Sequence, residues 1–181
     1  ALMRALLAAL REIPGKLAAY LRDVREVEAL AKILYTRDQV FFIGRGLDAA
    51  VAYEGSLKLK EISYINSFAI AAGELKHGTI ALMEPGTLVL CLATQDALYE
   101  KMLSNIQEIK ARGALVIGVA KDNSDAIEKQ SDMTIYIPDC IDEVSPVLEI
   151  VPLQILAYHI ARLRGCNIDK PKNLAKSVTV E

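Results

Sequence analysis

The chain has 181 residues, of which 52% are hydrophobic and 24% charged, and its formal net charge at pH 7 is −2. A chain of this length and composition can bury a substantial core and is expected to form one domain. Lysine and arginine are scattered along the sequence, so no broad positive surface for nucleic acid is predicted.

The three cysteines, Cys91, Cys140 and Cys166, are widely separated and lack the close spacing of a zinc site or a disulfide framework. They predict a reducing, cytoplasmic compartment, with Cys91 and Cys140 in or near the core. The most apolar stretch, residues 147–163, is interrupted by charged and polar side chains, which argues against a membrane span. No signal-peptide pattern opens the chain, and its start at Ala1 suggests a domain excised from a longer protein.

Along the chain, the spacing of hydrophobic residues alternates between the spacing typical of a helix and that typical of a strand. Helices are predicted at Leu2–Ile13 and Gly15–Tyr35, separated at Pro14. Apolar, β-branched runs predict strands at Gln39–Gly44, Thr87–Ala93, Ala114–Ala120 and Met133–Pro138. Further helices are predicted near Leu47–Ile65, Asp96–Arg112, Asp125–Gln130 and Glu143–Arg164.

Continuously apolar strands are typical of a sheet that is covered on both faces. The sequence therefore predicts a doubly wound parallel α/β sheet in three layers, with ligands at the carboxyl ends of its strands. The last residues, 168–181, show neither a helical nor a strand period, and Pro171 resists helix propagation there. Because this irregular tail still contains Leu174, Val178 and Val180, it is expected to dock.

Residues 54–78 combine acidic, lysine and histidine side chains within an otherwise apolar segment, which makes this segment the candidate reaction site. At about 100° per residue, Glu54, Lys58 and Glu61 lie on one stripe of the predicted helix. One interpretation is an ion-pair ladder on a helix surface. The other is a stripe that faces a pocket, where Lys58 keeps its neighbours ionised and burial raises a carboxylate pKa toward proton transfer. Lys60, on another side of the helix, is expected to be solvated.

Glycine brackets enclose the second polar segment, GELKHG at residues 73–78, and indicate a turn at each end. His77 in this segment can transfer a proton near neutral pH, although a single histidine is more often structural. His159 lies among apolar residues at helical spacing and is interpreted as structural. Gly44 and Gly46 follow the first strand without a full GxGxxG pattern, so a tight turn explains them and nucleotide binding is not supported.

Five motifs occur in order across nearly the whole chain: FFIGRG, YEGSLKLKEISYI, AAGELKHG, VPLQILAYHIA and PKNLAKSVTVE. Together they resemble the carboxyl-terminal sugar-isomerase (SIS) domain of isomerising glutamine:fructose-6-phosphate aminotransferases. The resemblance implies a flavodoxin-like fold in which residues 1–181 form a single SIS domain, the second isomerase domain of a longer enzyme. Residues 168–181 would be its functional tail.

The resemblance also implies an activity. A glutaminase domain and a first SIS domain, both absent from this chain, would precede it in the complete enzyme. Ammonia from glutamine would convert fructose 6-phosphate to glucosamine 6-phosphate without a metal or organic cofactor.

On the matching positions, the resemblance assigns four roles. Glu61 would move the proton between C1 and C2 of the sugar, and Lys58 would assist that transfer. His77 would assist ring opening and reach into the site of the partner subunit, which implies a homodimer. Lys176 would form a Schiff base with the open-chain ketose.

One difference from the family pattern limits the activity expected of this chain by itself. The segment Leu92–Asp96 stands where SIS domains usually bind phosphate, but it has a single hydroxyl and an acid that would repel phosphate. The fragment is therefore expected to fold, with sugar-phosphate binding and turnover both weak. Two alternatives remain open: a noncatalytic phosphosugar sensor, and a related amino-sugar phosphate isomerase or deglycase. Joint retention of Glu61, His77 and Lys176 favours an enzyme.

Overall fold

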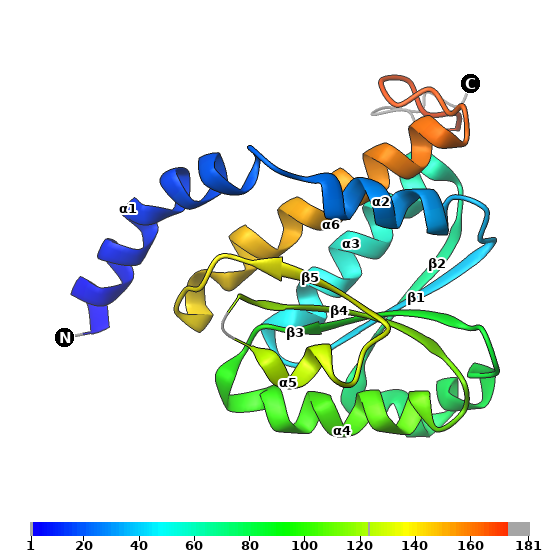
Figure 1. The fold of residues 1–181 in the computed structure, drawn as a ribbon, viewed down its shortest axis with the longest axis horizontal. Helices are drawn as coiled ribbons and strands as arrows, with labels where there is room; N and C mark the ends of the chain where they lie inside the picture. The colour runs from blue at the N-terminus through cyan, green and yellow to red at the C-terminus, as the bar shows by residue number, and fades with distance from the viewer. Residues whose placement is uncertain (1, 123, 174–181) are drawn as a thin grey trace, which may run out of the picture.

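A computed structural model describes residues 2–122 and 124–173 and shows a parallel sheet between two layers of helices (Figure 1). The strands are β1 (Gln39–Gly44), β2 (Asn66–Ala71), β3 (Leu88–Ala93), β4 (Leu115–Lys121) and β5 (Met133–Ile137). Their order across the sheet is β2-β1-β3-β4-β5, and every neighbouring pair is parallel. The predicted doubly wound α/β class is therefore confirmed.

The helices divide between the two faces of the sheet (Figure 1). One layer contains α2 (Arg25–Leu34), α3 (Leu47–Ser63) and α6 (Ser145–Leu163), and α1 (Leu2–Tyr20) projects from it. The other layer contains α4 (Tyr99–Lys110), α5 (Asp125–Glu128) and the short 3₁₀ segments η1 (Ala72–His77) and η2 (Thr79–Leu82). Two further 3₁₀ turns, η3 (Asp96–Leu98) and η4 (Asp142–Val144), lead into α4 and α6.

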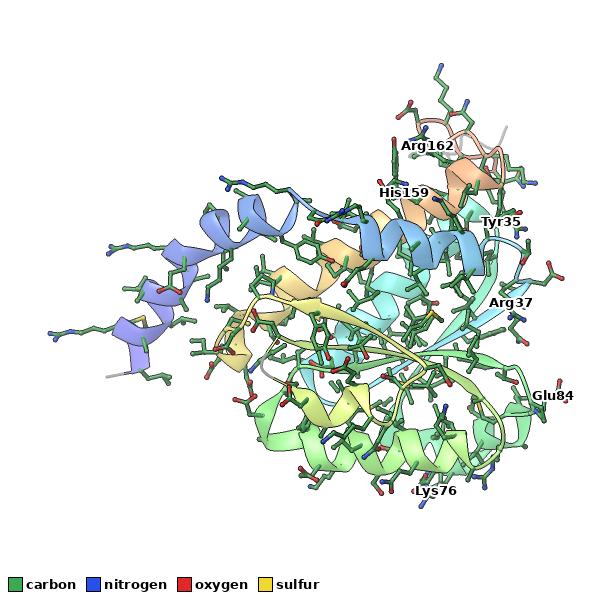
Figure 2. The ribbon with its side chains drawn as sticks, viewed as in Figure 1. Tyr35, Arg37, Lys76, Glu84, His159 and Arg162 are labelled. Atoms are coloured by element: carbon green, nitrogen blue, oxygen red, sulfur yellow. The ribbon has the colours of Figure 1, made fainter. Side chains whose placement is uncertain are left out.

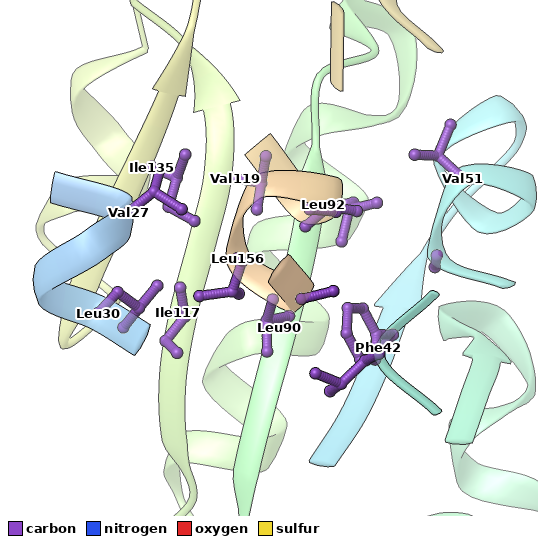
Figure 3. Packing of buried hydrophobic residues seen from close by; sticks show 14 of the residues in the cluster. Val27, Leu30, Phe42, Val51, Leu90, Leu92, Ile117, Val119, Ile135 and Leu156 are labelled. Carbon is purple, nitrogen blue, oxygen red and sulfur yellow. The ribbon is translucent and has the colours of Figure 1, made fainter. Parts of the chain in front are cut away.

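Two hydrophobic clusters fill the spaces between sheet and helices. Phe42 belongs to the cluster under α2, α3 and α6, whereas its neighbour Phe41 belongs to the cluster under α4. Successive strand residues point to opposite faces, so these two phenylalanines anchor both layers. Figure 3 shows the first cluster, in which Phe42, Leu90 and Leu156 pack together across strands and helix.

Helix α6 is the most apolar helix, and the segment Asp142–Leu163 is long and apolar enough to cross a membrane. Over half of its most apolar window is nevertheless buried inside the domain. Leu148, Leu153 and Leu156 belong to the cluster that α6 shares with α3 and the sheet. This helix is therefore the core helix of one layer.

The predicted helix boundary at Pro14 is wrong. Helix α1 continues through Pro14 to Tyr20, and the break falls at residues 21–24. A proline removes one helical hydrogen bond, a loss that α1 tolerates. At the observed break, a carboxylate oxygen of Asp23 accepts a hydrogen bond of 3.2 Å from the backbone N–H of Arg25, where α2 begins.

The sequence prediction also missed β2, whose first residues follow a helix that was expected to continue to Ile65. Helix α3 ends at Ser63, and Tyr64 takes the left-handed conformation with φ of 60°. The new strand is fixed to α3 by Ser67, whose hydroxyl lies 2.7 Å from the carbonyl oxygen of Ser56 and donates to it. Since β2 is a half-exposed edge strand containing two alanines, it lacks the continuous apolar run of the other strands.

Candidate functional site

The Glu54–Lys58–Glu61 stripe is present on α3. The Lys58 ammonium lies 2.6 Å from a Glu61 carboxylate oxygen and 3.5 Å from one of Glu54. The predicted ladder of contacts is thus confirmed. Lys58 and Glu61 are both about 30% exposed, so the stripe borders solvent, where a substrate or another domain can reach it. Lys60, on another side of α3, is exposed as predicted.

The hydrogen bond to Glu61 raises the pKa of Lys58 above its ordinary value, and the nearby charges of Glu61 and Glu54 act in the same direction. Lys58 is therefore a cation at neutral pH. At 2.6 Å this cation also fixes the orientation of the Glu61 carboxylate on the helix surface.

His77 is the last residue of η1, at the carboxyl end of β2. Its side chain is 72% exposed, and its Nδ1 lies 2.7 Å from a carboxylate oxygen of Glu74. A hydrogen bond to one ring nitrogen orients the imidazole and leaves Nε2 to act on a ligand. The prediction that glycines bracket a turn agrees with the compact 3₁₀ geometry of η1 and the positive φ of Gly78.

Within one chain, Glu61 and His77 lie at opposite ends of the parallel strands. Glu61 is near the end of α3, where β2 begins, whereas His77 follows the carboxyl end of β2. The six residues of β2 at about 3.3 Å each separate these two ends by about 20 Å. One chain alone therefore does not bring these two side chains into one site.

The segment after α6 returns to the end of α3 that carries Glu61 (Figure 1). The Cys166 thiol lies 3.8 Å from the carbonyl oxygen of Ser63. The backbone N–H of Lys172 donates to the Tyr64 hydroxyl at 2.8 Å, and its ammonium lies 4.4 Å from the centroid of the Tyr64 ring. Lys176 lies outside the described residues.

Polar side chains of the protein itself occupy the carboxyl edge between β1 and β3, where doubly wound sheets commonly bind ligands. The buried Asp48 carboxylate, in the first turn of α3, accepts hydrogen bonds from the backbone N–H and hydroxyl of Thr94 at 2.8 and 2.7 Å. The Thr94 hydroxyl also contacts Ser145 at 3.0 Å. Gly46 leaves space for the Gln95 side chain there, since a Cβ at Gly46 would lie 2.5 Å from the Gln95 Oε1.

A buried lysine extends this carboxyl-edge network. Lys121, at the end of β4, contacts Asp142 at 2.8 Å and Asp96 at 2.9 Å. Burial acts to lower the pKa of Lys121, but its bonds to the two carboxylates outweigh that effect and the pKa is raised. Asp48, Asp96 and Asp142 thus bring three carboxylates to this network, and Asp96 is the acid that the sequence places at the end of the segment Leu92–Asp96.

Glu149 of α6 is fully buried, and neither of its carboxylate oxygens has a hydrogen-bond partner among the described residues. Burial raises its pKa well above the ordinary 4.5, and the charge of Asp48 adds to this shift. A carboxyl group in such surroundings is held in its neutral form.

Glu149 should make the stability of the domain depend on pH. Because its folded-state pKa is raised, its contribution favours folding below pH 4.5 and is lost as the pH rises toward the folded-state pKa. We expect Glu149→Met to raise the free energy of unfolding at pH 8 by about 1–3 kcal/mol, with a smaller gain at pH 4. Urea unfolding at both pH values measures this, with the exposed Glu143→Gln as control. A less stable Glu149→Met protein at pH 8 would show that the carboxylate is partnered.

These features define a doubly wound α/β domain that presents a cation–carboxylate stripe, an exposed histidine and a segment after α6 that contacts the end of α3. The family model described as the SIS domain matches residues 33–164. The chain belongs to the SIS domain family.

Related proteins and solved structures support the assignment of the chain to the SIS domain family. Glutamine–fructose-6-phosphate aminotransferase [isomerizing] of Caldanaerobacter subterraneus is 58% identical over 97% of this chain, which spans only 29% of that relative's length. The C-terminal domain of glucosamine-fructose-6-phosphate aminotransferase from Francisella tularensis matches with a TM-score of 0.81 and 34% identity, over 90% of this chain and 46% of that one. Glucosamine-6-phosphate deaminase from Thermotoga maritima matches with a TM-score of 0.68 and 30% identity, over 87% and 46%.

Proposed function

We propose that this chain is the carboxyl-terminal isomerase domain of an enzyme that makes glucosamine 6-phosphate from fructose 6-phosphate and glutamine. The observation that carries the proposal is 58% identity to such an aminotransferase along 97% of the chain. Since the chain spans 29% of that relative, the complete activity needs further domains.

Glu61 is the proposed acid and base of the isomerisation. Once ammonia has formed an imine at C2 of the open-chain sugar, the Glu61 carboxylate takes a proton from C1 and returns it to C2. The proton of the C1 hydroxyl passes to the nitrogen, which leaves an aldehyde at C1 and an amine at C2. The contact with Lys58 at 2.6 Å supports this role because it holds the carboxylate in one orientation beside a cation. No metal or organic cofactor takes part in the proposed reaction.

Lys176 is the proposed amine that holds the open-chain ketose as a Schiff base before ammonia replaces it. Its place in the sequence supports this, because the chain is anchored at Tyr64 by Lys172, close to Glu61. From Asn173, three further residues reach at most about 11 Å, and a lysine side chain adds to that reach.

His77 is proposed to assist ring opening in the site of a partner subunit. The separation of Glu61 and His77 by the length of β2 supports a site shared between two chains. In such a homodimer, η1 of one protomer supplies His77 to the α3 stripe of the other. Complementation between chains that each lack one of the two groups tests this arrangement.

The preceding SIS domain is proposed to cover the apolar surface around the start of α3 and α6. A hollow there is lined by Ala50, Val51, Pro146 and Val147. Glu54 of the stripe also lines this hollow. Covering this hollow would bring the preceding SIS domain beside Glu54 and Lys58. The proposed compartment is the cytoplasm, which suits the three free cysteines.

A second candidate is an amino-sugar phosphate deaminase, which would use the same side chains without glutamine. The match to the Thermotoga maritima deaminase at 30% identity favours it. The two candidates differ in the direction of the reaction and in the source of nitrogen, because a deaminase releases ammonia from the amino sugar. Only the synthase consumes glutamine, and release of glutamate coupled to sugar amination distinguishes them.

A further inference from the structure

A basic hollow of about 260 Å³ lies between η1 and α4, away from the Glu54–Lys58–Glu61 stripe. Helix α4 contributes Lys101, Ser104 and Glu108, which share one face because they are three to four residues apart. The β1–α3 loop contributes Arg45, and η1 contributes Lys76. Figure 2 shows Lys76 on the outer side of the α4 layer. Three cationic side chains and one carboxylate therefore line this hollow.

Arg45 is held in place by a buried side chain. Its Nε donates a hydrogen bond of 2.9 Å to the Oδ1 of Asn105, which is only 5% exposed. Its two terminal nitrogens approach Gly73, where an added Cβ would meet them at 3.6 and 3.8 Å. The absence of a side chain at position 73 thus leaves space in front of the guanidinium fork.

The charges in the hollow are unevenly paired. Lys76 contacts Glu108 at 2.8 Å, so these two neutralise each other. Across the described ranges, no carboxylate lies within ion-pair distance of Arg45 or Lys101. Two positive charges and the hydroxyl of Ser104 therefore face the same small volume without a matching anion.

We propose that this hollow binds the phosphate group of a small phosphomonoester. A doubly charged phosphate matches the two unpaired cations, and the fixed guanidinium fork can donate to two of its oxygens. Lys101 and Ser104 donate to the remaining oxygens from α4. This basic hollow is distinct from the carboxyl-edge network, where the protein's own carboxylates repel such a group.

A bound phosphate would connect η1 to α4 and so restrict the segment that ends in His77. This consequence rests on the proposed function, because it matters only if His77 acts in catalysis. Binding itself does not depend on catalysis and can be measured on the 181-residue chain. A failure of the binding proposal would therefore leave the proposed reaction untouched.

The test is a titration followed by amide chemical shifts, first with inorganic phosphate and then with glycerol 3-phosphate. We expect saturable shifts at Gly73, Lys76 and Ser104. Lys101→Gln and Arg45→Gln should each weaken binding about tenfold, the loss of one charge-assisted contact. Lys110→Gln, on the same helix but paired with Asp132 outside the hollow, is the matched control and should change nothing.

Tighter binding of glycerol 3-phosphate identifies the ester as the ligand, whereas tighter binding of inorganic phosphate overturns the ester assignment. Shifts that stay linear with phosphate concentration, or that persist unchanged in Lys101→Gln, would overturn the site itself. The Lys101 variant keeps the test decisive if Arg45→Gln fails to fold, because Lys101 is exposed.

Discussion

Glu61→Gln in the complete enzyme is expected to lower the isomerisation rate by about 10²–10⁴-fold, with little change in sugar-phosphate binding. Glutamine keeps the shape of the side chain and retains an oxygen that can accept the hydrogen bond from Lys58. It cannot take a proton from carbon. The expected loss therefore falls on kcat and leaves KM nearly constant.

The measurement is the rate of glucosamine 6-phosphate formation, together with exchange of the C1 proton with solvent. Glu84→Gln makes the same chemical change at an exposed site on the periphery (Figure 2) and should leave both rates unchanged. Normal proton exchange in Glu61→Gln would show that another group moves the proton.

Lys176→Arg is expected to abolish the covalent adduct that borohydride traps with the sugar phosphate, and to lower turnover at least about 100-fold. An imine forms only from an amine that can lose its proton, and arginine remains charged. The substitution preserves a positive charge in the tail. The loss therefore reports on covalent chemistry.

Mass spectrometry of the reduced protein locates the adduct. Lys170→Arg, an exposed position six residues earlier in the same tail, is the matched control and should keep the adduct at full yield. An adduct that survives in Lys176→Arg, or one found on Lys58, would assign the Schiff base to a different amine.

The sheet could be predicted where the strands are continuously apolar. β1, β3 and β4 are buried along most of their length, β5 is partly buried, and each of the four strands has a clear hydrophobic run. β2 lies at the edge, and only one of its six residues is fully buried, so its signal was weak. The turn that ends α3 depends on a left-handed Tyr64, which has no reliable sequence signature.

The candidate site could be predicted only in part for a related reason. Helical spacing is local, so it correctly placed Lys58 between Glu54 and Glu61. The separation of Glu61 from His77 depends on β2 and could not be derived without it. Glu149 carried an unused signal, an acid within an otherwise apolar stretch of α6, but its lack of partners becomes apparent only once α6 packs in the core.

The central claim is that one reaction site takes Glu61 from one chain and His77 from another. Complete chains carrying Glu61→Gln and complete chains carrying His77→Ala each lose activity when assayed alone. When the two are co-expressed, random pairing makes half of the dimers hybrid, and each hybrid has one intact site. The account predicts recovery of about one quarter of the wild-type activity. Activity no higher than that of either variant alone would contradict it.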